Sequence, residues 1–177
     1  NLTLPQLFAH LMAERNFYVK VANGLQRIVT TSVDTMAVGI HKGRLTLFVN
    51  PEFLNKVSMQ MGVYVLEHEM YHVVMDHISR YLEALSLYLY PETRERAASI
   101  ANVAMDCADN TNLRNSAYFE TARQETRAFI QQKHPGHPLE DTDGMVLPEH
   151  YGLRTDGSYE WYQNALLEKS GQRKRPR

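Results

Sequence analysis

The sequence has little cysteine, little net charge and no long hydrophobic run, and each shortage excludes a class of protein. A single cysteine, Cys107, among 177 residues excludes an intramolecular disulfide and is compatible with a reducing compartment. No unbroken apolar run is long enough to span a bilayer, so we expect no membrane association. The formal net charge of -1 at pH 7 gives no overall attraction to nucleic acid or to an anionic membrane surface.

The two ends of the chain carry little targeting information. The first residues do not show the charged and then apolar pattern of a secretory signal peptide, which leads us to expect a cytoplasmic protein. Basic residues gather at 173–177, and we expect a basic, disordered tail over 168–177, with nucleic-acid binding as the less favoured alternative. The remaining residues, 1–167, are expected to form one domain with a hydrophobic core.

The most informative stretch is 66–72, where His68, Glu69 and His72 stand in the spacing HExxH. On a helix, residues four apart lie nearly one above the other, so the two histidines can chelate one metal ion. Glu69 then lies beside this pair, where it can take a proton from an activated water without being a ligand. The spacing is therefore typical of a hydrolytic zinc site.

The apolar surroundings of this motif separate a metal site from a chance match. Between 58 and 78, apolar side chains cover most of the circumference of the predicted helix, which indicates a buried helix. Two histidines and an acid inside such a helix would be costly without partners. A metal ion is the most economical partner for all three, and core histidines that are satisfied by other groups are the alternative.

A second predicted helix, at 91–113, carries polar residues inside an otherwise apolar pattern. Asn102, Asp106 and Asn110 are successively four residues apart, so they share one face of that helix. A buried aspartate needs a charged partner, and the two histidines need a third protein ligand. We therefore expect Asp106 to complete the metal site. Asp109 is the rival ligand, and a further alternative is an aspartate that only orients a histidine.

The other predicted elements surround these two helices. A hairpin is expected from strands at 35–40 and 44–49, and its outer edge could align an extended peptide beside the metal. A purely structural hairpin is an equally good interpretation. The remaining expectations are helices at 2–20, 80–90, 116–133 and after Ser158, and an irregular or short helical connection at 25–33.

Three more histidines are less favoured as ligands. His77 follows His72 by five residues, so an unbroken helix would turn it away from the metal, and we expect it to pack or to contact a ligand. His134 and His137 lie close to several acids and could form a second metal site. The proline and glycine between and around them favour a flexible linker instead.

Four stretches in this order resemble a family of metallopeptidase domains that often precede VWA-like domains in bacterial and phage proteins. These stretches are 49–53, 68–77, 102–110 and 147–153. The resemblance implies a minimal zincin of the α+β class, mostly helical and with a small sheet beside the motif helix. It also implies that the positions matching His68, His72 and Asp106 hold zinc, and that Glu69 is the catalytic acid and base.

Taken together, these features lead us to expect a zinc-dependent metallopeptidase that acts on a peptide or protein substrate. The alternative is a catalytically silent protein of the same fold that binds a partner protein, such as a host protein, and in which the metal is structural. A ferrous oxygenase could use the same ligand set. Glu69, next to a ligand, favours hydrolysis over that chemistry.

Overall fold

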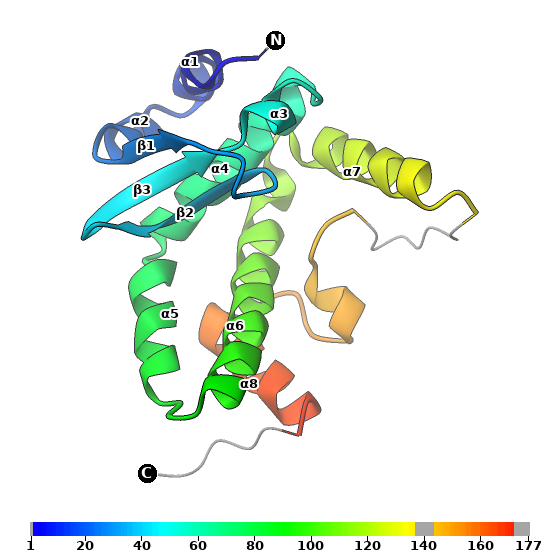
Figure 1. Cartoon of the computed structure of the whole chain (residues 1–177). Coiled ribbons are helices and arrows are strands. Elements are labelled where there is room, and N and C mark those ends of the chain that lie inside the picture. The colour runs from blue at the N-terminus through cyan, green and yellow to red at the C-terminus, as the bar shows by residue number, and fades with distance from the viewer. Residues whose placement is uncertain (1, 137–143, 172–177) are drawn as a thin grey trace.

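A computed structural model describes residues 2–136 and 144–171 and has many helices around one small sheet (Figure 1). The α+β class that the sequence predicts is confirmed. The elements in chain order are α1 Leu4–Glu14, α2 Asn16–Asn23, β1 Gln26–Val29, β2 Met36–His41, β3 Arg44–Val49, α3 Pro51–Leu54, α4 Met59–Val74, α5 His77–Ser86, α6 Pro91–Asn112, η1 Leu113–Asn115, α7 Phe119–Lys133, η2 Pro148–Tyr151 and α8 Tyr159–Lys169.

The sheet has the strand order β1-β3-β2, which leaves β2 at an edge. β2 and β3 are the predicted hairpin, with Met36 opposite Val49, and Lys42 and Gly43 turn the chain with positive φ angles of 50° and 74°. β1 pairs in parallel with β3, so the expectation of an irregular or helical connection at 25–33 is wrong. A strand of only four residues is too short to show a period of two, and its pairing with a distant strand is what defines it.

The single helix expected over 2–20 is two helices, because the chain turns at Arg15. Arg15 has φ -143° and ψ 78°, outside the helical region. Its guanidinium lies 3.3 Å from the carboxylate of Glu67, which is 1% exposed and also accepts a hydrogen bond of 2.6 Å from the Ser116 hydroxyl. A buried carboxylate requires such partners. The break in the helix places the Arg15 guanidinium where it can contact Glu67 of α4.

The motif helix, α4, ends at Val74, four residues earlier than expected, and this ending brings His77 back towards the site. Asp76 has φ 51° and ψ 36°, a left-handed conformation that separates α4 from α5. His77 then begins α5, where it is 1% exposed and its ring packs 5.5 Å from that of Tyr159. The expectation that His77 points away from His72 required an unbroken helix, and the bend removes that condition.

The remaining predicted helices are present with shifted ends, as α5, α6, α7 and α8. α8 begins after Ser158, whose hydroxyl oxygen accepts a hydrogen bond from the Trp161 N–H, and it continues to Lys169. The helix thus includes the first two positions of the tail expected from residue 168, and 172–177 lie outside the described residues. Within the described part of the chain, no helix has the length and apolar character needed to cross a membrane.

Two hydrophobic cores lie on either side of the contact between α4 and α6. The larger core joins α1, α2, the sheet, α4 and α7, and it includes Leu66 and Met70 of α4, both fully buried. The smaller core joins α6 and α8, and it includes Ala104 and Tyr162, also fully buried. Because each helix turns its apolar face to its own core, the polar faces of α4 and α6 are left to meet.

Candidate metal centre

The first part of the site is the pair of histidines on α4. Ser58 begins this helix, because its hydroxyl oxygen accepts a hydrogen bond from the N–H of Met61. Ten and fourteen residues further on, His68 and His72 lie one helical turn apart, with side chains 15% and 12% exposed. Their Nε2 atoms are 3.1 Å apart. Two lone pairs on one helix face are therefore directed at the same small volume.

Asp106 on α6 supplies the third donor atom at this point. Its Oδ1 lies 3.4 Å from Nε2 of His68 and 3.5 Å from Nε2 of His72, so the three atoms form a nearly equilateral triangle. In a tetrahedral zinc site with bonds of ~2.0–2.1 Å, neighbouring donors are about 3.3–3.4 Å apart. The donor set therefore fits a zinc ion held by three protein ligands, with one position left open.

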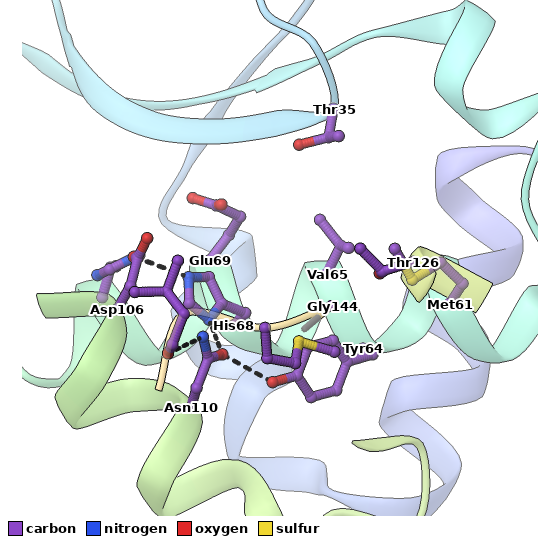
Figure 2. Close-up of a pocket in the computed structure, with 13 residues that line it drawn as sticks. Thr35, Met61, Tyr64, Val65, His68, Glu69, Asp106, Asn110, Thr126 and Gly144 are labelled. Carbon is purple, nitrogen blue, oxygen red and sulfur yellow. Dashed lines mark hydrogen bonds and ion pairs between the residues drawn. The ribbon is translucent and has the colours of Figure 1, made fainter. Parts of the chain in front are cut away.

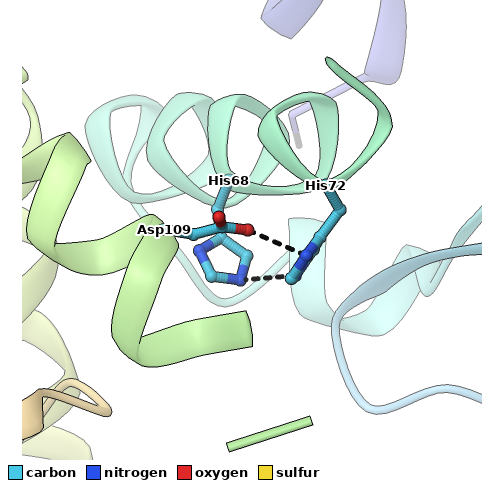
Figure 3. Close-up of side chains that lie close together, drawn as sticks. All are labelled: His68, His72 and Asp109. Atoms are coloured by element: carbon cyan, nitrogen blue, oxygen red, sulfur yellow. Dashed lines mark hydrogen bonds and ion pairs between the residues drawn. The ribbon is translucent and has the colours of Figure 1, made fainter. Parts of the chain in front are cut away.

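Asp109, one turn further along α6, lies on the other side of His72. Its carboxylate is fully buried, and its Oδ2 is 2.8 Å from Nδ1 of His72 (Figure 3). The same Oδ2 is 3.3 Å from Nδ1 of His77. Donor atoms of His68, His72 and Asp109 also lie within 4.8 Å of one another, which makes them a second candidate ligand set. Because Nδ1 and Nε2 are on different edges of the ring, Asp109 is better placed to orient His72 than to share a metal with its Nε2.

Asn110 holds the other imidazole (Figure 2). Its Oδ1 lies 3.1 Å from Nδ1 of His68 and accepts a hydrogen bond of 2.7 Å from the Tyr64 hydroxyl. Its Nδ2 donates to the carbonyl of Val146 at 3.0 Å, which fixes which end of the amide faces the histidine. An amide oxygen only accepts, so Nδ1 of His68 carries the proton and Nε2 keeps its lone pair for the centre of the site.

Glu69 is 8% exposed and faces β2. Its Oε2 accepts a hydrogen bond of 2.9 Å from the backbone N–H of Val38. Burial raises the pKa of Glu69, and the opposing effects of His68, His72 and the Val38 N–H are smaller. A carboxyl group with a raised pKa is suited to accept a proton and to return it at neutral pH.

The charges of the site are strongly coupled. Burial opposes the charged form of His72, but the interactions with Asp106 and Asp109 outweigh it and raise the pKa of His72 to about 10. Burial likewise opposes the charged form of Asp106, and the two histidines on α4 nevertheless hold the pKa of Asp106 well below its usual range. A positive charge is thus stabilised at the centre of the triangle, where a metal cation would replace the proton.

A cavity of about 300 Å³ opens beside these groups. Its lining comes from α4, α6, α7, the residue before β2 and the segment that precedes η2. The lining residues are Thr35, Met61, Tyr64, Val65, His68, Glu69, His72, Asp106, Asn110, Thr126, Gly144, Met145 and Val146. The face of the site that a fourth ligand would use is therefore accessible to a bound molecule.

The structure brings together all four residues that the sequence singled out, His68, Glu69, His72 and Asp106. The contact of Asn110 with His68 was not predicted, although Asn110 was placed on the same face of its helix as Asp106. The Val38 contact had no signal in the sequence, because it depends on how the sheet packs on α4. Among the described residues, the group of possible metal ligands does not include His134. His137 lies outside the described residues.

Comparison with known proteins gives one match. Residues 5–136 match the model of a family described as "Putative metallopeptidase domain". This match covers well over half of the chain and contains all of α4 and α6, hence every donor atom of the triangle. A comparison with curated proteins and one with solved structures gave no match.

Proposed function

The chain belongs to this family of metallopeptidase domains, and we propose that it is a zinc-dependent metallopeptidase. The observation that carries the proposal is the triangle of donor atoms from His68, His72 and Asp106, with Glu69 beside it at the wall of a cavity. Two imidazoles and one carboxylate are a common ligand set of catalytic zinc, since they leave one position open. The family match supports the same chemistry.

In this proposal, zinc is held by Nε2 of His68, Nε2 of His72 and Oδ1 of Asp106. Bound there, zinc would polarise the carbonyl of the scissile peptide bond and lower the pKa of a water molecule towards about 7. Asp109 and Asn110 hold the Nδ1 edges of the two rings and thereby keep both Nε2 atoms directed at the metal.

Glu69 is the acid and base of the reaction. It takes a proton from the attacking water as the new bond between oxygen and the carbonyl carbon forms. It then gives that proton to the amine nitrogen as the carbon–nitrogen bond breaks. The Val38 N–H occupies Oε2 of Glu69, so we assign the proton transfer to Oε1.

The edge strand β2 is the surface that would align the substrate. The Val38 N–H is directed at Glu69 and not at β3, and the alternation of an antiparallel pair turns the peptide groups of Met36 and Ile40 the same way. An extended peptide can pair with such an edge and run past the metal. We therefore propose β2 as the strand to which the substrate main chain binds.

The test is the Glu69→Gln variant, compared with the parent and with Glu83→Gln, a matched change at an exposed glutamate of α5. Zinc content is measured after dialysis, and hydrolysis is measured on casein and on a peptide library. We expect about one zinc per chain in all three proteins. Cleavage should fall by about 10²–10⁴-fold in Glu69→Gln and remain at the parent level in Glu83→Gln.

Three results would contradict the proposal, and each removes a different part of it. A parent protein that retains no stoichiometric zinc would remove the metal assignment. Full cleavage by Glu69→Gln would remove Glu69 from the mechanism while leaving the metal in place. If all three proteins bind zinc and none cleaves, the metal is structural and the chain is a binding protein of this fold.

A further inference from the structure

The cavity beside the metal centre has two chemically different ends (Figure 2). The charged groups that line it all belong to the metal end, where Glu69 lies. Val65 and Met61 precede Glu69 by four and eight residues, so they continue the same face of α4 away from the metal. Thr126 of α7 lies near Met61 at the far end, and Met145 also lines the cavity. A molecule that reached from the metal along α4 would therefore pass from charged to apolar surroundings.

The wall formed by Gly144, Met145 and Val146 is fixed at two points. Gly144 has a φ of +99°, and a Cβ there would lie 2.7 Å from the backbone oxygen of Arg123, so only glycine allows this approach to α7. Two residues later, the Val146 carbonyl accepts a hydrogen bond of 3.0 Å from Nδ2 of Asn110. Met145 is held between these anchors. This wall of the cavity is therefore built into the fold.

The position of this wall in the chain is also informative. The family match ends at residue 136, and Gly144, Met145 and Val146 lie beyond it. The metal ligands come from the matched part of the chain, whereas one wall of the adjoining cavity does not. These residues form a connecting segment before η2, and connecting segments held on a rigid scaffold commonly carry binding contacts.

From these observations, and resting on the proposed function, we infer that the apolar end of the cavity is a specificity pocket. It receives one large apolar side chain of the substrate, next to the bond that is cleaved. The volume of about 300 Å³ is at the low end for ligand pockets, so it suits one side chain and the adjoining peptide unit. Two methionines, Met61 and Met145, can adapt their shape to unbranched, branched or aromatic groups. A charged side chain would lose its hydration among these apolar groups.

The test uses three peptide hydroxamates that share a zinc-chelating group and differ in one side chain, which is isobutyl, methyl or carboxyethyl. Each is titrated by calorimetry into the zinc-loaded protein, so the readout is binding and not turnover. We expect the isobutyl compound to bind at least about tenfold more tightly than the methyl compound. The carboxyethyl compound should bind most weakly.

A second variant tests whether the cavity itself sets the order of affinities, by introducing a positive charge into its lining. In Met145→Lys the carboxyethyl compound should become the tightest of the three, because the new ammonium group gives its carboxylate a partner. The matched control is Met12→Lys, which places the same change on an exposed methionine of α1 that does not line this cavity. This control should keep the parent order of affinities.

The outcomes separate the pocket from the proposed function. Equal affinity of the three compounds for the zinc-loaded parent, or an unchanged order in Met145→Lys, overturns the pocket and leaves the metal centre standing. A parent that holds zinc but binds none of the compounds also overturns the pocket. Failure of the protein to hold zinc overturns the proposed function, and the pocket with it.

Discussion

The two helices that form the candidate metal centre contribute in different ways. α4 carries the groups that would take part in the reaction, which are two imidazoles and the carboxyl group of Glu69 within five consecutive residues. α6 carries one donor atom, on Asp106, and two groups that hold the imidazoles from behind, on Asp109 and Asn110. Reactivity is thus concentrated on one helix and orientation on the other.

This division has a physical reason. One helix face cannot both direct an imidazole at a metal and hold its second nitrogen, because the two nitrogens lie on different edges of the ring. The holding groups must come from an element that faces the histidines, and α6 fills that position because its apolar face packs on α8. Substitutions on α6 should therefore have effects that range from loss of the metal to loss of the orientation of the two imidazoles.

The largest expected effect on α6 is that of Asp106→Ala. Removal of a group that hydrogen-bonds to a ligand typically lowers metal affinity by about 10–100-fold. Removal of the ligand itself should lower zinc affinity by more than that. Affinity is measured by competition with a chromophoric zinc chelator, and circular dichroism checks that the helices remain. If Asp109→Ala abolishes zinc binding while Asp106→Ala retains it, the two aspartates have exchanged roles and Asp109 is the ligand.

A smaller effect is expected for Asp109→Asn. The amide keeps the size of the side chain but removes the negative charge that lies 2.8 Å from Nδ1 of His72. Zinc affinity should fall by about 10–100-fold, with one zinc still bound per chain at saturation. The same competition assay measures it, and Asp156→Asn, at an exposed position before α8, is the matched control. An unchanged affinity would show that the pair does not orient His72.

These differences also explain how far the sequence alone could reach. His68, Glu69 and His72 are contiguous, so the regular geometry of one helix predicts that they converge. Asp106 was selected because an aspartate in an apolar helix needs a partner, and the helix period gave its face. In the structure the Asp106 side chain is 34% exposed, and the fully buried aspartate of this helix is Asp109. These inferences use local geometry and the cost of burying charge, which sequence reports directly.

The missed features all depend on contacts between elements. β1 was missed because only pairing with β3 makes a strand of that segment. The break at Arg15 accompanies an ion pair between Arg15 and the buried carboxylate of Glu67, fifty-two residues away. The contact of His77 with the site requires the left-handed residue Asp76, and nothing local announces that α4 stops there. Such features are determined by tertiary packing, which cannot be inferred from a local pattern of residue types.

The hydrogen bond between Val38 of β2 and Glu69 of α4 allows a test of how the Glu69 carboxylate is oriented. In Val38→Pro the N–H that reaches Glu69 is lost, and no hydrogen bond of the sheet is removed because this N–H faces away from β3. Loss of one hydrogen bond to a charged group should lower kcat/KM by about tenfold. Val38→Ala keeps the N–H and controls for lost packing. Equal activity of the two variants would mean that Oε2 needs no such support.

The smallest expected effect concerns how the two helices begin. α4 has a side-chain cap at Ser58, whereas α6 begins at Pro91 after a residue that makes no such bond. Ser58→Ala removes the acceptor for the Met61 N–H and the hydroxyl that donates to Glu125, and it should lower the free energy of unfolding by about 1 kcal/mol. Urea denaturation of the zinc-free protein measures this loss. Zinc affinity should stay within about twofold of the parent, because His68 lies almost three turns from the cap. A large loss of affinity in Ser58→Ala would mean that the start of α4, and not α6, sets the position of the two histidines.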